Sequence, residues 1–232
     1  MRVKIFADGA RLDDMLAASK SGMISGLTTN PTLMRQAGLT DYAGFAKEVL
    51  AKITDFPISF EVFADDFPTM ERQAREIAAW GKNVYVKIPV TNTKGESAVP
   101  LIAKLAKGGV KLNVTAILTL AQVRDVVNAL DASVPAVVSV FAGRIADTGR
   151  DPVPLMREAL EICAAKPKAE LLWASPREVL NIYQADEIGC HIITVTPDLL
   201  KKLSLKGKDL AQYSLETVEM FYRDAAAAGF SI

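Results

Sequence analysis

The chain has 232 residues, half of them hydrophobic and 23% charged, which is the balance of a globular protein with a substantial core. Its 27 basic and 27 acidic residues give a formal net charge of zero, which argues against nucleic acid or a membrane surface as a partner. Two cysteines and a single histidine, His191, give poor support to a disulfide framework, a multi-histidine metal site or a Ser-His-Asp triad.

Short β-rich runs alternate with segments of helical character. Strands are predicted at residues 3–7, 26–29, 58–64, 84–89, 111–115, 136–141, 171–174 and 191–196, and the clearest helices between them at 67–80, 96–107, 120–130, 152–165 and 176–184. Nearly continuous apolar strands indicate a parallel sheet buried on both faces, and this length favours a closed barrel. We therefore predict an α/β fold, one (β/α)8 TIM barrel domain covering residues 1–232.

Helix-start chemistry refines these boundaries. Asn30 and Thr196 each precede a proline suited to the first helical position. Thr119 with Gln122 fits a capping box, and Ser175 with Glu178 fits another, so Ser175 is predicted to begin a helix.

An additional C-terminal helix is predicted at about residues 207–229. Its apolar stripe consists of Leu215, Val218, Phe221, Tyr222 and Ala225. The stripe can pack on its own barrel or form a subunit contact, and the sequence leaves both readings open.

Polar side chains gather where the predicted strands end, which is where barrel enzymes carry their functional residues. They are Asp8, Thr28, Thr29, Asn30, Glu61, Lys87, Asn113, Thr115, Ser139, Arg144, Ser175 and Arg177. Charged groups inside apolar strands are costly unless they are paired or used. This pattern is the strongest functional signal in the sequence.

Lys87 lies within the apolar strand VYVKIP. A lysine in a buried strand loses hydration, which favours a neutral amine able to attack a ketone carbonyl and form an iminium, an electron sink for C–C cleavage. The alternative is a strand-end lysine that reaches solvent or pairs with Glu61. Asp8 and Glu61 have a similar alternative as members of a core ion pair.

Five segments together resemble the transaldolase family in order and spacing. They are GLTTNPT at 26–32, VKIP at 86–89, NVTA at 113–116, SVFAGRIAD at 139–147 and ASPR at 174–177. The chain length is similar to that of the small bacterial and archaeal subgroup, which includes transaldolases and fructose-6-phosphate aldolases. Fructose-6-phosphate aldolases carry glutamine at the position of Glu61, so the carboxylate, with Ser139 and Arg177, favours transaldolase.

The resemblance implies a role for each matching residue. Lys87 matches the Schiff-base lysine, Asp8 the aspartate that moves the C4 hydroxyl proton, and Glu61 the glutamate that positions a catalytic water, with Thr115 beside it. The substrate-binding positions are Thr28, Asn30, Asn113, Ser139, Arg144, Ser175 and Arg177, of which the last three match the phosphate end. Arginine forks suit phosphate oxygens, although Arg144 could also form only a local salt bridge with Asp147.

The implied reaction is transfer of a dihydroxyacetone unit from a ketose phosphate, fructose 6-phosphate or sedoheptulose 7-phosphate, to an aldose phosphate. No metal or organic cofactor is expected, because the lysine is the electrophilic catalyst. Alternatives are a fructose-6-phosphate aldolase-type lyase, a transaldolase for another anionic ketose, and a silent barrel that only binds sugar phosphates. With no signal peptide or bilayer-length apolar run, we expect a cytoplasmic protein, and the resemblance implies a homo-oligomer, a pentamer or decamer.

Overall fold

The computed structural model describes residues 1–230 and divides into two compact units, Met1–Leu200 and Lys201–Ile232. In the first unit the strands are β1(Lys4–Asp8), β2(Gly26–Thr28), β3(Ile58–Glu61), β4(Val84–Pro89), β5(Leu112–Ile117), β6(Ala136–Val140), β7(Ala169–Trp173) and β8(Ile192–Val195). Every neighbouring pair is parallel, and β1 pairs with β8, so the sheet closes into a barrel. The predicted (β/α)8 architecture is confirmed.

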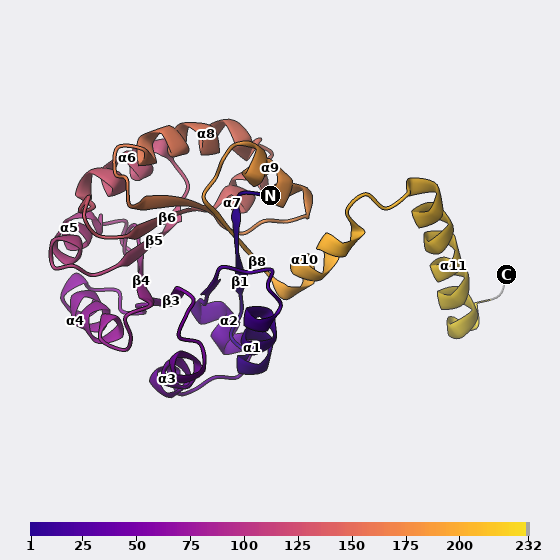
Figure 1. Cartoon of the computed structure of the whole chain (residues 1–232), viewed down its shortest axis with the longest axis horizontal. Helices are drawn as coiled ribbons and strands as arrows, with labels where there is room; N and C mark the ends of the chain where they lie inside the picture. Colours follow the sequence, from indigo (N-terminus) through magenta and orange to yellow (C-terminus); the bar gives the residue numbers. More distant parts are fainter. Residues whose placement is uncertain (231–232) are drawn as a thin grey trace. The chain divides into compact units, whose positions relative to one another are not determined.

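Helices connect the strands and cover the outside of the sheet (Figure 1). They are α1(Leu12–Lys20), α2(Pro31–Gln36), α3(Tyr42–Lys52), α4(Phe67–Ala78), α5(Val99–Lys107), α6(Leu120–Ala129), α7(Ala142–Ala146), α8(Pro152–Cys163) and α9(Leu180–Glu187). A further short helix, α10(Pro197–Lys202), follows β8. The amphipathic α4 buries Met70, Ala74 and Ile77, one stripe of its surface, while its other positions stay partly or fully exposed.

The core lies between the helices and the barrel wall. Leu27, Ile58, Val86 and Leu112 come from four successive strands and are fully withdrawn from solvent. Because both faces of a parallel barrel sheet are covered, these strands can be apolar at nearly every position. Polar side chains within them are therefore exceptions that require partners.

Two predicted helix starts are confirmed in atomic detail. The side chain of Asn30 accepts a hydrogen bond from the Leu33 amide at 2.9 Å and caps α2. Thr119 and Gln122 form the reciprocal capping box of α6.

The predicted helix start at Ser175 is wrong. Helix α9 begins at Leu180, without a side-chain cap, and Ser175 has a φ of 57°. A capping residue normally has an extended backbone, whereas Ser175 is left-handed. The reason is tertiary: the Gly143 amide donates to the Ala174 carbonyl at 3.2 Å, and this close approach fixes the course of the chain after β7.

The second unit contains the short 3-10 helix η1(Leu203–Leu205) and the helix α11(Leu210–Ala228), which lies within the predicted range 207–229. Asp209 caps its start by accepting from the Gln212 amide, and Gly229 ends it with a φ of 68°. Across residues 1–230, no helix combines the length and the apolar character needed to cross a membrane.

Candidate active site

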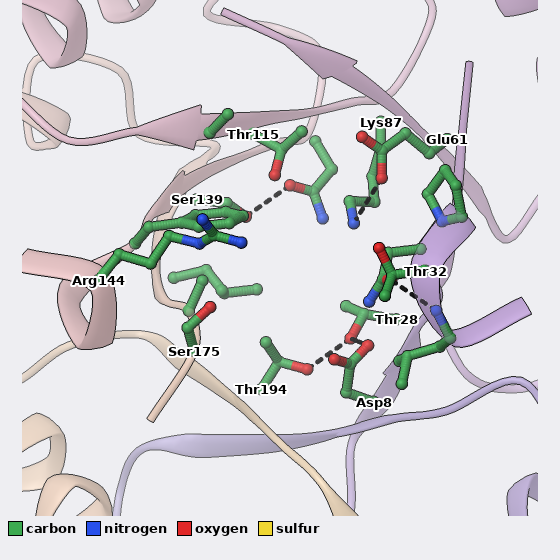
Figure 2. A pocket seen from close by; sticks show the side chains of 18 of the residues that line it. Asp8, Thr28, Thr32, Glu61, Lys87, Thr115, Ser139, Arg144, Ser175 and Thr194 are labelled. Atoms are coloured by element: carbon green, nitrogen blue, oxygen red, sulfur yellow. Dashed lines mark hydrogen bonds and ion pairs between the residues drawn. The ribbon is translucent and has the colours of Figure 1, made fainter. Parts of the chain in front are cut away.

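A cavity of about 640 Å³ opens at the carboxyl ends of the strands (Figure 2). Ten of the predicted site residues line it: Asp8, Thr28, Asn30, Glu61, Lys87, Asn113, Thr115, Ser139, Arg144 and Ser175. Within residues 1–230, the side chains that line this cavity do not include the eleventh predicted residue, Arg177. Side chains separated by more than 160 residues in sequence thus meet around one space, as the barrel topology requires.

Lys87 is the buried cation of this cavity, with 7% of the residue exposed. Its Nζ donates to the Thr29 carbonyl at 2.8 Å and lies 3.0 Å from Glu61 Oε2. The strand register explains the pair, because Glu61 and Lys87 are partners across β3 and β4 and so present their side chains on the same face. The ion pair that the sequence offered as an alternative does form, and it lies inside the cavity.

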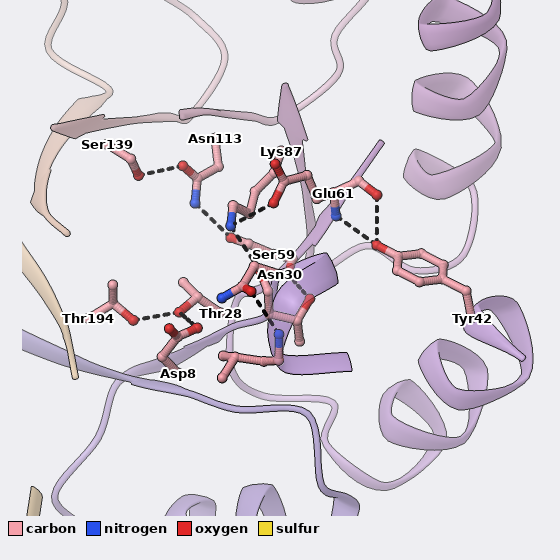
Figure 3. Close-up of polar contacts among 12 residues, drawn as sticks. Asp8, Thr28, Asn30, Tyr42, Ser59, Glu61, Lys87, Asn113, Ser139 and Thr194 are labelled. Carbon is pink, nitrogen blue, oxygen red and sulfur yellow. Dashed lines mark hydrogen bonds and ion pairs between the residues drawn. The ribbon is translucent and has the colours of Figure 1, made fainter. Parts of the chain in front are cut away.

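Asp8 reaches the same cavity from β1. Thr28 donates to Asp8 Oδ1 at 2.9 Å, and a hydroxyl–hydroxyl hydrogen bond joins Thr28 to Thr194 (Figure 3). Burial raises the pKa of Asp8 above its ordinary value, against the opposing effect of the positive charge on Lys87. Asp8 is therefore better suited to exchange a proton near neutral pH than an exposed aspartate is.

Two buried polar residues of this network were not predicted from the sequence. Thr194 interrupts the apolar run of β8, and Ser59 interrupts that of β3. Each faces the barrel interior, so the signal that revealed Lys87, a polar residue in an apolar strand, was present for both of them.

Asn113 is held rigidly between neighbours. Ser139 donates to its Oδ1 at 2.6 Å, while its Nδ2 donates to Ser59 Oγ at 3.0 Å (Figure 3). The Oδ1 of Asn30 already accepts one hydrogen bond in capping α2, which orients the side chain, and its amide nitrogen can donate to a ligand in the cavity. These contacts fix the side chains before any substrate enters.

Arg144 and Ser175 also line the cavity and lie across it from Lys87 and Glu61 (Figure 2). The Arg144 guanidinium lies over the Phe141 ring, 5.6 Å from its centroid. The suggested Arg144–Asp147 salt bridge is wrong, because Asp147 is held instead by the fork of Arg177, with Nε to Oδ1 at 2.9 Å and Nη2 to Oδ2 at 2.5 Å. Arg177 lowers the pKa of Asp147 through these hydrogen bonds.

A family model described as Transaldolase/Fructose-6-phosphate aldolase matches residues 5–232. The chain belongs to this family. Proteins named probable transaldolase are similar to it: one from Dehalococcoides mccartyi is 35% identical over 202 residues, covering 87% of this chain and 90% of the relative. One from Thermoanaerobacter sp. is 37% identical over 203 residues, covering 87% and 89%, and one from Methanococcus maripaludis is 36% identical over 202 residues, with the same coverage.

The family membership confirms the resemblance and supports an enzyme of the transaldolase type. Solved structures show similarity at the level of the fold alone. KGPDC from Streptococcus mutans is 11% identical, with a TM-score of 0.58 over 84% of this chain and 88% of that one. CutC from Streptococcus agalactiae is 14% identical, with a TM-score of 0.62 over 83% and 97%.

For a transaldolase/fructose-6-phosphate aldolase family member, the site has a clear division of chemistry. A buried amine lies beside one carboxylate, Glu61, while a second carboxylate, Asp8, reaches the cavity from another strand. The arrangement offers a nucleophile and two separate groups able to accept and return protons.

Proposed function

We propose that this protein is a transaldolase that transfers a dihydroxyacetone unit from a ketose phosphate to an aldose phosphate through a Schiff base on Lys87. The observation that carries the proposal is the placement of Lys87 Nζ, buried in the cavity and 3.0 Å from Glu61. A buried amine next to a proton acceptor is the arrangement that nucleophilic catalysis by lysine needs.

The first half-reaction begins when the Lys87 ammonium gives a proton to the neighbouring Glu61 carboxylate, and the neutral amine then attacks the C2 carbonyl of the ketose. The carbinolamine then loses water to give an iminium. A water molecule positioned by Glu61 and Thr115, which line the same cavity as Lys87, carries protons from the nitrogen to the departing hydroxyl.

Cleavage follows from the iminium. Asp8 accepts the proton of the C4 hydroxyl, the C3–C4 bond breaks, and its electron pair moves into the iminium to form an enamine on Lys87. The aldose phosphate leaves. An acceptor aldehyde, for which we propose erythrose 4-phosphate, is then attacked by the enamine carbon, and Asp8 returns its proton to the new hydroxyl. Water finally releases the product ketose from Lys87.

The substrate has an anionic end for which Arg144 is the proposed partner. Arg144 lines the cavity across from the Lys87–Glu61 pair, with Ser175 on the same side (Figure 2). A guanidinium can bind phosphate oxygens in bidentate fashion. Another anionic tail of similar size would satisfy the same contacts, and a panel of ketoses distinguishes them.

Borohydride reduction in the presence of fructose 6-phosphate tests this proposal. We expect a reduced dihydroxyacetone or hexose adduct whose peptide map places it on Lys87, and no adduct in Lys87→Met. An adduct on another residue, or none in the wild type, would refute the Schiff-base assignment. Binding of sugar phosphate without an adduct would indicate a catalytically inactive barrel that only binds these ligands.

Product analysis distinguishes transfer of the dihydroxyacetone unit from simple aldol cleavage that releases it. With erythrose 4-phosphate present, a transaldolase forms sedoheptulose 7-phosphate and releases little free dihydroxyacetone. Rapid release of dihydroxyacetone without an acceptor would identify a fructose-6-phosphate aldolase-type lyase instead. The kinetics should be ping-pong, because the first product leaves before the acceptor binds.

A further inference from the structure

The hydrogen-bond ladder between β2 and β3 ends one rung before Glu61. The Leu27 amide donates to the Pro57 carbonyl at 2.9 Å, and the Thr29 amide donates to the Ser59 carbonyl at 3.2 Å. In a regular parallel ladder the next rung would join the Glu61 amide to the Thr29 carbonyl, and an amide at residue 31 to the Glu61 carbonyl. Residue 31 is a proline, which has no amide hydrogen to donate.

The hydroxyl of Tyr42 occupies this missing rung. The Glu61 amide donates to Tyr42 Oη at 2.7 Å, and Tyr42 Oη donates to the Glu61 carbonyl at 2.8 Å (Figure 3). One phenol thus satisfies both backbone groups that a neighbouring strand would otherwise pair. Buried backbone groups left without hydrogen-bond partners cost free energy, so this contact stabilises the end of β3.

The replacement of these ladder hydrogen bonds by the Tyr42 hydroxyl changes which acceptor is available to Lys87. The Thr29 carbonyl, which a regular ladder would give to the Glu61 amide, instead accepts a hydrogen bond from Lys87 Nζ at 2.8 Å. Lys87 therefore lies between a backbone acceptor from the end of β2 and the Glu61 carboxylate from β3. Because the Tyr42 hydroxyl pairs with the Glu61 amide, the Thr29 carbonyl is free to accept the hydrogen bond from Lys87.

The phenol is itself held firmly. Tyr42 is the first residue of α3, whose start is capped by Asp41. Its ring packs against Phe63 and Trp80, with centroids 5.5 and 5.9 Å away. Burial raises the pKa of the phenol, so Tyr42 is a protonated donor at neutral pH.

We infer that Tyr42 is a positioning residue for the Schiff-base step: its hydroxyl replaces a strand rung and thereby sets the places of Glu61 and Lys87. The inference rests on the proposed function, because it concerns the same lysine and carboxylate. Nothing in the sequence resemblance assigned a role to Tyr42.

The test is Tyr42→Phe, which keeps the ring in its aromatic cluster and removes only the hydroxyl. Tyr85→Phe is the matched control, since Tyr85 is half-buried and lines a different cavity, at the amino ends of the strands. We expect Tyr42→Phe to reduce kcat and the rate of borohydride-trappable adduct formation about tenfold, equivalent to about 1.4 kcal/mol, with KM little changed. Tyr85→Phe should keep the wild-type values.

Trp80→Phe provides a second variant. It retains the Tyr42 hydroxyl but reduces the aromatic contact that holds the Tyr42 ring in place. Its rate of adduct formation should fall between those of the wild type and Tyr42→Phe. Wild-type rates of adduct formation in folded Tyr42→Phe, even with a lower melting temperature, would reduce Tyr42 to a structural role and overturn the inference. If Tyr42→Phe does not fold, an unchanged rate in Trp80→Phe has the same effect. Absence of any adduct in the wild type would instead refute the proposed function.

Discussion

Lys87 Nζ and Glu61 Oε2 lie 3.0 Å apart while only 9% and 16% of their side chains are exposed. An ion pair so withdrawn from water is a poor source of stability, because desolvation offsets much of the attraction. The same enclosure is useful for chemistry, since it keeps the amine and its proton acceptor together and limits competition from bulk water.

The first prediction concerns the charge of Glu61. Glu61→Leu keeps a side chain of similar size but removes both its charge and its ability to hold a water, so dehydration of the carbinolamine should slow by roughly 10²–10⁴-fold. Stopped-flow mixing with fructose 6-phosphate, followed by borohydride quenching, measures this step. A variant that forms the adduct at the wild-type rate would show that Glu61 is not the proton carrier.

Asp8→Asn should separate activity from stability. Turnover should fall by roughly 10²–10⁴-fold, because the amide cannot take the C4 hydroxyl proton. The melting temperature at neutral pH should rise. A folded-state pKa raised by burial means that the stability present below the unfolded pKa of about 3.8 is lost as pH rises through the folded value, and asparagine avoids that loss.

The pH dependence of the wild type checks the sign of this effect. Chemical denaturation between pH 4 and neutral pH should show a component of stability that decreases with rising pH and is missing in Asp8→Asn. Equal pH slopes in the two proteins would contradict the raised pKa of Asp8.

Arg144 and Arg177 should differ as phosphate ligands. The fork of Arg177 already holds Asp147 in a bidentate pair, whereas Arg144 lines the cavity. Arg144→Gln should therefore raise KM for fructose 6-phosphate at least tenfold, by the loss of a charge-assisted hydrogen bond of about 1.5–3 kcal/mol, and Arg177→Gln should raise it less. Steady-state kinetics with phosphorylated and unphosphorylated ketoses compares them, and a larger effect at Arg177 would mean that its pair with Asp147 opens for substrate.

Gly143 is expected to tolerate no side chain. A Cβ there would lie 1.5 Å from the Ser175 carbonyl oxygen, so the backbone carrying Arg144 or Ser175 would have to move. Gly143→Ala should destabilise the protein by about 1–3 kcal/mol or more and weaken phosphate binding. Gly9→Ala is the control for stability, because an added Cβ there meets nothing within 4 Å. Denaturant unfolding of both variants gives the comparison.

Helix α11 leads us to expect a homo-oligomer. Leu215, Val218, Phe221 and Tyr222, four members of the predicted stripe, are each more than half exposed. Neighbouring apolar side chains of this size on one helix usually mark an interaction surface. Light scattering should give a mass several times that of one chain, and replacing Leu215, Val218 and Phe221 by serine should lower it. A monomeric wild type would contradict the prediction.

Much of the barrel was predictable because its strands are apolar on both faces and its helices begin with local capping chemistry, as at Asn30 and Thr119. Local rules failed at Ser175, where the backbone is set by the close approach of Gly143 rather than by its own sequence neighbours. Local rules also gave no indication that Tyr42 contacts the backbone of Glu61. Its partner is the backbone of a strand about twenty residues away, and only the path of the chain through Pro31 makes that partner available.

The oxygen that Lys87 contacts opposite Glu61 belongs to the peptide bond of Thr29, not to a side chain. No amino-acid replacement at position 29 deletes that atom, so divergence at this codon leaves the acceptor in place. Mutation can remove the amine or its acidic neighbour in a single step, but it can displace the third member of the group only by rerouting the main chain around Asn30 and Pro31. This makes the lysine's anchorage more resistant to mutational drift than the reactive groups themselves.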